Sequence, residues 1–167
     1  MVRILGIDPG SRCTGYGIIE QQGQKLFWIA HGKIVTEGHE LSSRLLQIHE
    51  QLKSVIGCYQ PQDSAIEEVF MYRNAQSALK LGQARGAAIV ATVSQGIPIT
   101  EYSARQIKQA VVGYGAATKD QVQNMIKMLL GLKKIPESDS ADALAIAICH
   151  SHCQTVFKKM QQFSKNI

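Results

Sequence analysis

The sequence has few cysteines and prolines, and it has no apolar run long enough to cross a membrane. Its 167 residues include four cysteines at irregular spacing and four prolines. A chain of this length can build a hydrophobic core without disulfides, so reduced thiols in a cytosol are expected. The longest apolar stretch, residues 86–93, is far shorter than the roughly 20 residues of a membrane-spanning helix. The first 20 residues carry an acid inside their apolar run, which excludes a signal peptide. We therefore expect a cytoplasmic protein with no membrane partner.

The composition is that of a globular protein with a moderate positive charge. Apolar residues make up 45% of the chain and charged residues 19%, which excludes disorder, and the length predicts one domain. The formal net charge is +5. This excess is compatible with a polyanionic partner such as nucleic acid, but many basic proteins bind none.

Short apolar segments and helical periodicities alternate along the chain. Strands are expected at 3–8, 14–20, 25–35, 64–69 and 97–102, and helices from 41 to before Pro61, at 74–95, 103–112 and 119–131, and from about 139 past 148. The first three strands should form an antiparallel meander, and the later two should lie parallel to the first because they enter by crossovers. This order predicts an α/β fold with a five-stranded mixed sheet and helices on both faces. Glycines in the second strand indicate that another element approaches its backbone closely.

Four acidic residues interrupt these apolar segments. Asp8 ends the first strand before Pro9, Glu67 lies in the fourth strand, and Asp139 and Asp142 begin the last helix. Each has a structural interpretation. Asp8 can start a turn, Glu67 can face solvent with Glu68 on the opposite side, and Asp139 can stabilise the positive end of the helix. Taken singly, the structural interpretation is the commoner one for each acid.

Taken together, the four acids predict a metal-dependent site. Asp139 and Asp142 share one stripe of a helix that is otherwise apolar, and Asp8 and Glu67 should meet at the carboxyl ends of neighbouring strands. Clustered carboxylates repel, and a divalent cation removes that conflict. Oxygen ligands favour Mg²⁺ or Mn²⁺ over Zn²⁺. Two such ions suit phosphoryl chemistry, one at the attacking water and one at the leaving oxygen.

Four segments carry a resemblance to a known family. They are GIDPGSRCTGYG (6–17), AIEEVFMYRNAQSALKLGQARG (65–86), EYSARQIKQAVVGYG (101–115) and DSADALAIAICH (139–150). In these segments the chain resembles the RuvC-type Holliday junction resolvases, bacterial endonucleases with an RNase H-like fold. The resemblance covers residues 2 to about 153. It implies a nuclease domain at 1–153 and a basic tail at 154–167, which can be a frayed helix or disordered.

The resemblance implies a reaction, a cofactor and partners. Asp8, Glu67, Asp139 and Asp142 would be the catalytic residues that bind the metal, with Mg²⁺ as the ion and Mn²⁺ able to substitute. The family acts as a homodimer on a four-way DNA junction in recombination and repair. It nicks two opposing strands symmetrically, leaving 5′-phosphate and 3′-hydroxyl ends, and its usual partner is the RuvAB branch-migration complex.

Aromatic and basic residues are candidates for DNA contacts. Phe70 and Tyr72 follow Glu67, with Arg73 beside them, and an exposed aromatic there could stack on an unpaired base. The spacing alone leaves Phe70 equally consistent with a core position, and the family pattern favours a role at the junction centre. By resemblance, Lys108 and Lys119 lie near the scissile phosphate. Weaker candidates, because charged helix residues usually face water, are Lys80, Arg85 and Arg105.

Two further segments have more than one interpretation. The small residues of the helix at 74–95 allow packing on the sheet or, by resemblance, a dimer interface. The run CHSHC at 149–153 looks like a zinc cluster, but structural zinc sites usually use two separate ligand groups, so a helical stripe meeting the core is favoured.

Two other functions stay as hypotheses beside the nuclease. An actin-like ATPase also begins with a strand, an Asp and a Gly-Ser turn, but that architecture needs two such domains. A junction-binding module without catalysis is the other, and the intact set of four acids argues against it.

Overall fold

The computed structural model describes residues 1–69 and 74–164, and five strands and five helices lie in these ranges. The strands are β1 (Val2–Asp8), β2 (Cys13–Gln22), β3 (Lys25–Val35), β4 (Asp63–Glu67) and β5 (Ile99–Tyr102). The helices are α1 (Leu41–Tyr59), α2 (Ala75–Val93), α3 (Ala104–Val112), α4 (Lys119–Leu129) and α5 (Ser138–Ser164). The strands form one sheet in the order β3-β2-β1-β4-β5. The first three are antiparallel neighbours, and β4 and β5 run parallel to β1, as the sequence predicts.

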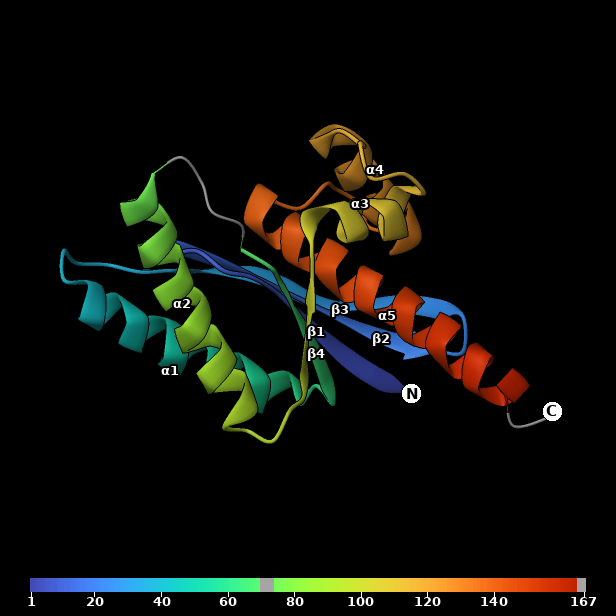
Figure 1. Ribbon diagram of the computed structural model, residues 1–167, viewed down its shortest axis with the longest axis horizontal. Helices are drawn as coiled ribbons and strands as arrows, with labels where there is room; N and C mark the ends of the chain where they lie inside the picture. The colour runs from blue at the N-terminus through green and yellow to red at the C-terminus, as the bar shows by residue number, and fades with distance from the viewer. Residues whose placement is uncertain (70–73, 165–167) are drawn as a thin grey trace.

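Helices cover both faces of the sheet (Figure 1). Helices α1 and α2 pack on one face around buried residues that include Leu5, Ile18 and Ile66. Helices α3, α4 and α5 cover the other face, where Ile4, Ile19 and Leu144 are buried. Two separate apolar layers therefore hold the sheet between them, and hydrophobic burial on each side keeps its strand ends in fixed relative positions.

Helix α5 lies unusually close to strands β1 and β2. A side-chain carbon at Gly6 or Gly15 would collide with the α5 backbone at Ala143 or Asp139, and one at Gly17 would collide with Leu144. The close approach predicted from the glycines of the second strand is therefore confirmed, and the element that approaches is α5. This contact brings the first turns of α5 to the carboxyl end of β1.

The structure differs from the expected elements at two places. The β2–β3 pairing shifts between Ile18 and Ile19, so β3 lacks the regular alternation of buried and exposed side chains that a strand normally has, and both Phe27 and Trp28 are exposed. Cys149 is buried while Cys153 is exposed, so the two cysteines do not both meet the core. Helix α5 also continues as one helix to Ser164, through most of the segment for which a frayed helix and disorder were both left open.

Candidate active site

Asp8 is the last residue of β1, and hydrogen bonds hold the turn that follows it. The hydroxyl of Thr14 donates to the carbonyl of Gly10 at 2.8 Å and accepts from the Gly10 amide at 3.3 Å. The hydroxyl of Thr36 donates to the carbonyl of Ser11 at 2.9 Å. Both threonines are buried, and their hydroxyls satisfy backbone groups of the turn. The turn interpretation of Asp8 is therefore correct, and the same turn holds the carboxyl group at the end of the strand.

Glu67 ends β4 beside Asp8. The parallel pairing of β1 with β4 runs to Ile7 and Ile66, so Asp8 and Glu67 follow at the same end of the sheet. The guanidinium of Arg85 donates to the backbone carbonyl of Glu67 at 3.1 Å and also forms an ion pair with Glu101. Arg85 therefore supports the strand end that carries Glu67. The sequence made it a weak candidate for DNA contact, and the structure gives it this intramolecular role.

Asp139 and Asp142 lie in the first turns of α5, where the sequence placed them. Ser138 is the first residue of the helix, and Asp142 is half-buried. Because β1 and β2 carry glycine at the points of contact, these turns rest directly against the strands beside Asp8. The structure therefore brings all four predicted acids to one end of the sheet.

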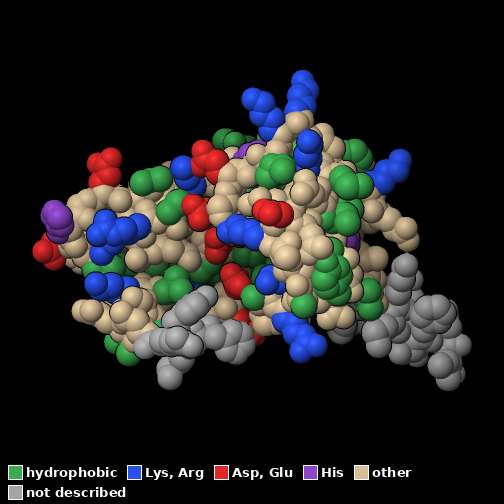
Figure 2. All heavy atoms as spheres, turned by 90° about the horizontal axis from the view of Figure 1, so that it is seen from above, with side chains coloured by type: hydrophobic (Ala, Val, Ile, Leu, Met, Phe, Trp, Pro, Cys, Tyr) green, Lys and Arg blue, Asp and Glu red, His purple; other side chains and the backbone are tan. Residues whose placement is uncertain are grey.

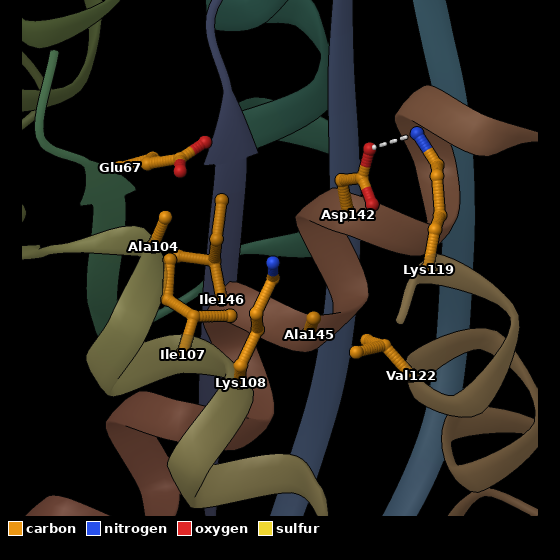
Figure 3. A pocket seen from close by; sticks show the side chains of 9 residues that line it. All are labelled: Glu67, Ala104, Ile107, Lys108, Lys119, Val122, Asp142, Ala145 and Ile146. Atoms are coloured by element: carbon orange, nitrogen blue, oxygen red, sulfur yellow. Dashed lines mark hydrogen bonds and ion pairs between the residues drawn. The ribbon is translucent and has the colours of Figure 1, made fainter. Parts of the chain in front are cut away.

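Glu67 and Asp142 face each other across a pocket of about 230 Å³ (Figure 3). Lys108 from α3 rises between them, and Lys119 from α4 donates to a carboxylate oxygen of Asp142 at 2.9 Å. A capping box between Thr118 and Gln121 starts α4 immediately before Lys119, which sets the position of that lysine. The apolar part of the wall consists of Ala104, Ile107, Val122, Ala145 and Ile146.

The surroundings of the Asp8 carboxyl group disfavour its charged form. Burial, and then the negative charges of Asp142, Glu67 and Asp139, raise the pKa of Asp8 to about 7, while Lys119 lowers it. Burial and Asp142 also raise the pKa of Glu67, against the opposing effect of Lys108 and Lys119. Two lysines therefore only partly compensate the negative charge that the fold gathers here.

Cys13 is a member of this site that the sequence analysis missed. Its thiol donates to Oδ2 of Asp139 at 3.0 Å. Burial and the hydrogen bond to Asp139 raise the pKa of Cys13 to about 11, so the thiol keeps its proton and remains a donor near neutral pH. Cys13 precedes Asp139 by 126 residues, and only the position of β2 under α5 brings them together.

The donor set fits a hard divalent cation. All four acids offer carboxylate oxygens, and a cation beside Asp8 would offset the burial and the neighbouring negative charges that raise its pKa. In the described ranges, however, no three carboxylate, imidazole or thiol groups converge closely enough to hold an ion. Lys119 donates to one oxygen of Asp142, and the Cys13 thiol donates to one oxygen of Asp139. Two of the four acids therefore already have a partner within the protein.

The face of the molecule that contains this site carries both signs of charge. Figure 2 shows acidic side chains gathered near its middle, with Lys and Arg side chains on either side of them. Lys80 and Arg105 are exposed, as a DNA contact requires and as a solvated helix face also explains. Three other predicted DNA-binding residues, Phe70, Tyr72 and Arg73, lie outside the described residues. Over the part of the chain that the structure covers, no helix combines the length and apolar content needed to cross a bilayer.

Comparisons with known proteins agree with this architecture. Residues 4–150 match the family model described as crossover junction endodeoxyribonuclease RuvC. Two relatives carry that same description. The one from Coxiella burnetii is 58% identical over 95% of this chain and 92% of its own length. The one from Geobacter sulfurreducens is 59% identical over 90% of this chain and 93% of its own length.

A solved structure shares both the fold and part of the sequence. It is T. thermophilus RuvC in complex with a Holliday junction substrate, and it is 35% identical to this chain. The two superpose with a TM-score of 0.88 over 93% of this chain and 96% of that one. The matches favour the nuclease over the actin-like ATPase hypothesis. The family model spans most of the chain and the relatives align over nearly their whole length, so the chain belongs to the RuvC family of crossover junction endodeoxyribonucleases.

Proposed function

We propose that this chain resolves four-way DNA junctions by hydrolysing one phosphodiester bond in each of two opposing strands. Asp8, Glu67, Asp139 and Asp142 would bind two Mg²⁺ ions, with Mn²⁺ able to substitute, and the products would carry 5′-phosphate and 3′-hydroxyl ends. One observation carries the proposal. Glu67 and Asp142 line a pocket that two lysines also reach, and the charges of both acids and of Asp139 act on the neighbouring Asp8. Cleavage of a polyanion needs both signs of charge in one place, since acids alone would repel it.

The clustered acids would attract cations, but without a bound cation their mutual repulsion lowers the stability of the protein. The turn after β1 holds Asp8, and the end of β4 holds Glu67, so the two carboxylates cannot move apart to reduce their repulsion. When bound, divalent ions supply an activated water as nucleophile and stabilise the charge on the leaving oxygen. Lys119 contacts only one carboxylate oxygen of Asp142, and that oxygen becomes available to a cation when Lys119 releases it. The ammonium group is then available for a phosphate.

Lys108 and Lys119 would hold the scissile phosphate between the acids. They come from two different helices and lie on the wall of the same pocket, so their charges approach one phosphate group from different directions. A lysine ammonium binds phosphate as a point charge and tolerates the change of geometry during hydrolysis. Phe70, Tyr72 and Arg73 complete the proposed DNA contacts at the junction centre.

Symmetric nicking requires two sites, and helix α2 offers a face for a second copy. Leu79, Val90 and Val93 expose most of their side chains there, and Gly82 and Gly86 have open space around them. Such a face, apolar and shallow, allows two helices to approach closely. We therefore propose that the chain acts as a homodimer. We further propose that this dimer is cytoplasmic and works with the RuvAB branch-migration complex.

The test is a nicking assay on a synthetic four-way junction. We expect paired nicks in opposing strands with Mg²⁺ or Mn²⁺, and none in excess EDTA. Asp142→Asn should lower the cleavage rate by roughly 10²–10³-fold, the loss typical of one electrostatic group in an active site. Asp120→Asn is the matched control, because Asp120 is an exposed acid on α4 next to Lys119. Full activity in EDTA would overturn the proposal, and tight binding without cleavage in either metal would identify a junction-binding module instead.

A further inference from the structure

A groove outside the acidic pocket has no part in the site described above. It has a volume of about 560 Å³ and lies between β3 and the connection from α4 to α5. Trp28 and His31 line one wall, and residues 130–136 line the other. The indole Nε1 of Trp28 donates to Nδ1 of His31 at 2.8 Å, and the two rings lie 5.6 Å apart. This bond holds the indole in place while 45% of Trp28 stays exposed.

The groove is positively charged at its rim. Lys133 and Lys134 are both exposed, and no acidic residue is among those that line it. Glu137 follows close by, but its carboxylate is paired with Lys33. Among the described residues neither Lys133 nor Lys134 takes part in an ion pair. The groove thus offers two free positive charges beside an apolar aromatic surface, which is complementary to a sugar-phosphate backbone.

The sheet fixes how far the groove lies from the acids. Lys33 on β3 pairs with Gly15 on β2, and Gly15 pairs with Asp8, so the three residues form one row across the sheet. Two strand spacings amount to about 10 Å, and the five residues from Lys33 to Trp28 to about 17 Å along β3. Combined at right angles, these give about 20 Å between Asp8 and Trp28, which lies at the far end of the groove. A duplex rises 3.4 Å per base pair, so this is about six base pairs of DNA.

We propose that this groove binds the backbone of one junction arm, about six base pairs from the scissile phosphate. Lys133 and Lys134 contact phosphates, and the exposed face of Trp28 packs against deoxyribose. The inference rests on the proposed nuclease function, because it places the scissile phosphate beside Asp8. If the groove binds an arm, the affinity of the protein for a junction depends on the length of the arms as well as on the junction centre.

Trp28 provides a direct readout, since it is the only tryptophan in the chain. The Asp8→Asn chain, used to prevent cleavage, is titrated with two junctions. One has arms of about 15 base pairs, and the other has arms of about 4 base pairs closed by short non-nucleotide linkers. We expect the long-arm junction to change the emission of Trp28 and the short-arm junction to leave it unchanged. Equal responses to the two junctions, or no response to either, would overturn the proposal.

The lysines are tested by a double variant and a control of equal charge change. Lys133→Ala/Lys134→Ala should bind the long-arm junction about tenfold more weakly, with a salt dependence reduced by about two contacts per protomer. Its affinity for the short-arm junction, and its rate of nicking that junction, should stay at the wild-type values. Lys53→Glu removes the same two units of charge from α1 and should change neither. A double variant that behaves like Lys53→Glu contradicts the proposal.

The outcomes separate this inference from the nuclease function. If the wild-type chain nicks no junction but Trp28 still responds to long arms, the nuclease function fails and the groove stands. If nicking is normal and Trp28 is silent, the groove fails alone. A change of Trp28 emission with protein concentration in the absence of DNA would assign the groove to a second copy of the chain and overturn the proposal.

Discussion

Helix α5 meets buried polar groups at two places, and the two differ in how their charges are balanced. At its start, Asp139 and Asp142 join Asp8 and Glu67, and burial followed by the negative charges of the other three acids raises the pKa of Asp8 to about 7. In its middle, the polar groups around His150 are paired with one another. There His150 Nδ1 lies 3.0 Å from the hydroxyl of Tyr102 and Nε2 lies 3.1 Å from Asp63, while Gln154 also contacts Asp63.

The difference indicates which cluster stabilises the protein and which one acts on a ligand. In the cluster around His150, polar groups that would be costly to bury singly satisfy one another, and this joins the start of β4, the end of β5 and α5. The acidic cluster is balanced only in part, by Lys119 at Asp142 and by Cys13 at Asp139. A fold keeps unbalanced charge of this kind at positions where a cation or a substrate completes it. Four predictions test this comparison.

The largest effect is expected from breaking the balanced cluster. His150→Ala removes the partner of the buried Tyr102 hydroxyl and one partner of the half-buried Asp63 carboxylate, and it leaves a cavity, which together should lower the free energy of unfolding by about 3–5 kcal/mol. Denaturant unfolding measures the loss. The double variant Asp63→Ala/His150→Leu should lose less than the sum of the single changes, because no charge is left unpaired. Junction cleavage per folded molecule should stay near wild type at a permissive temperature. A change below about 1 kcal/mol would mean that this cluster does not stabilise the fold.

Asp8→Asn is expected to raise, rather than lower, the free energy of unfolding of the metal-free protein. The pKa of Asp8 rises from 3.8 to about 7 on folding, so stability is lost as the pH rises through that range. Asp8→Asn mimics the protonated acid. In EDTA the free energy of unfolding of this variant should equal that of the wild type near pH 4 and should exceed it at pH 8 by roughly 2–4 kcal/mol. Added Mg²⁺ should narrow the gap, because the ion stabilises only the chain that binds it.

Thermal melts across this pH range check the Asp8 prediction, with Asp120→Asn as the control. A variant that melts below wild type at pH 8 in EDTA would show that Asp8 does not carry unfavourable charge. The comparison between the two clusters would then lose its basis.

Sequence patterns predicted the acidic cluster but not the contacts that surround it. Strand order follows from local periodicity and connection rules, so the meeting of Asp8 and Glu67 at one sheet edge could be derived. The bond between Cys13 and Asp139 and the support of Glu67 by Arg85 could not. They depend on how side chains of distant elements pack, and no local pattern encodes that. The histidines of CHSHC show the same limit, since His150 contacts Tyr102 and His152 contacts the carbonyl of Ala110.

A smaller effect is expected at Lys119, where the acidic cluster is partly compensated. Lys119→Ala removes a charged donor from the proposed phosphate site, which should lower the maximal cleavage rate about 10- to 100-fold. It also frees Asp142 and makes the cluster more negative, so half-maximal activity should need less Mg²⁺. Metal titrations of the cleavage rate separate the two effects, with Lys127→Ala on the same helix as control. If excess metal restored the wild-type rate, Lys119 would act on the metal and not on the phosphate.

The smallest effect concerns the hydrogen bond between Cys13 and Asp139. Cys13→Ala removes the donor, so the Asp139 carboxylate loses a contact worth about 0.5–1.5 kcal/mol. The Mg²⁺ concentration for half-maximal cleavage should change several-fold while the maximal rate stays near wild type. Cys13→Ser keeps a donor and should restore most of the wild-type value. Ala and Ser have nearly the same volume, so a packing role alone predicts the same change for both variants. The ranking of these two variants in a metal titration therefore decides whether Cys13 positions Asp139 for the ion or only fills space beneath α5.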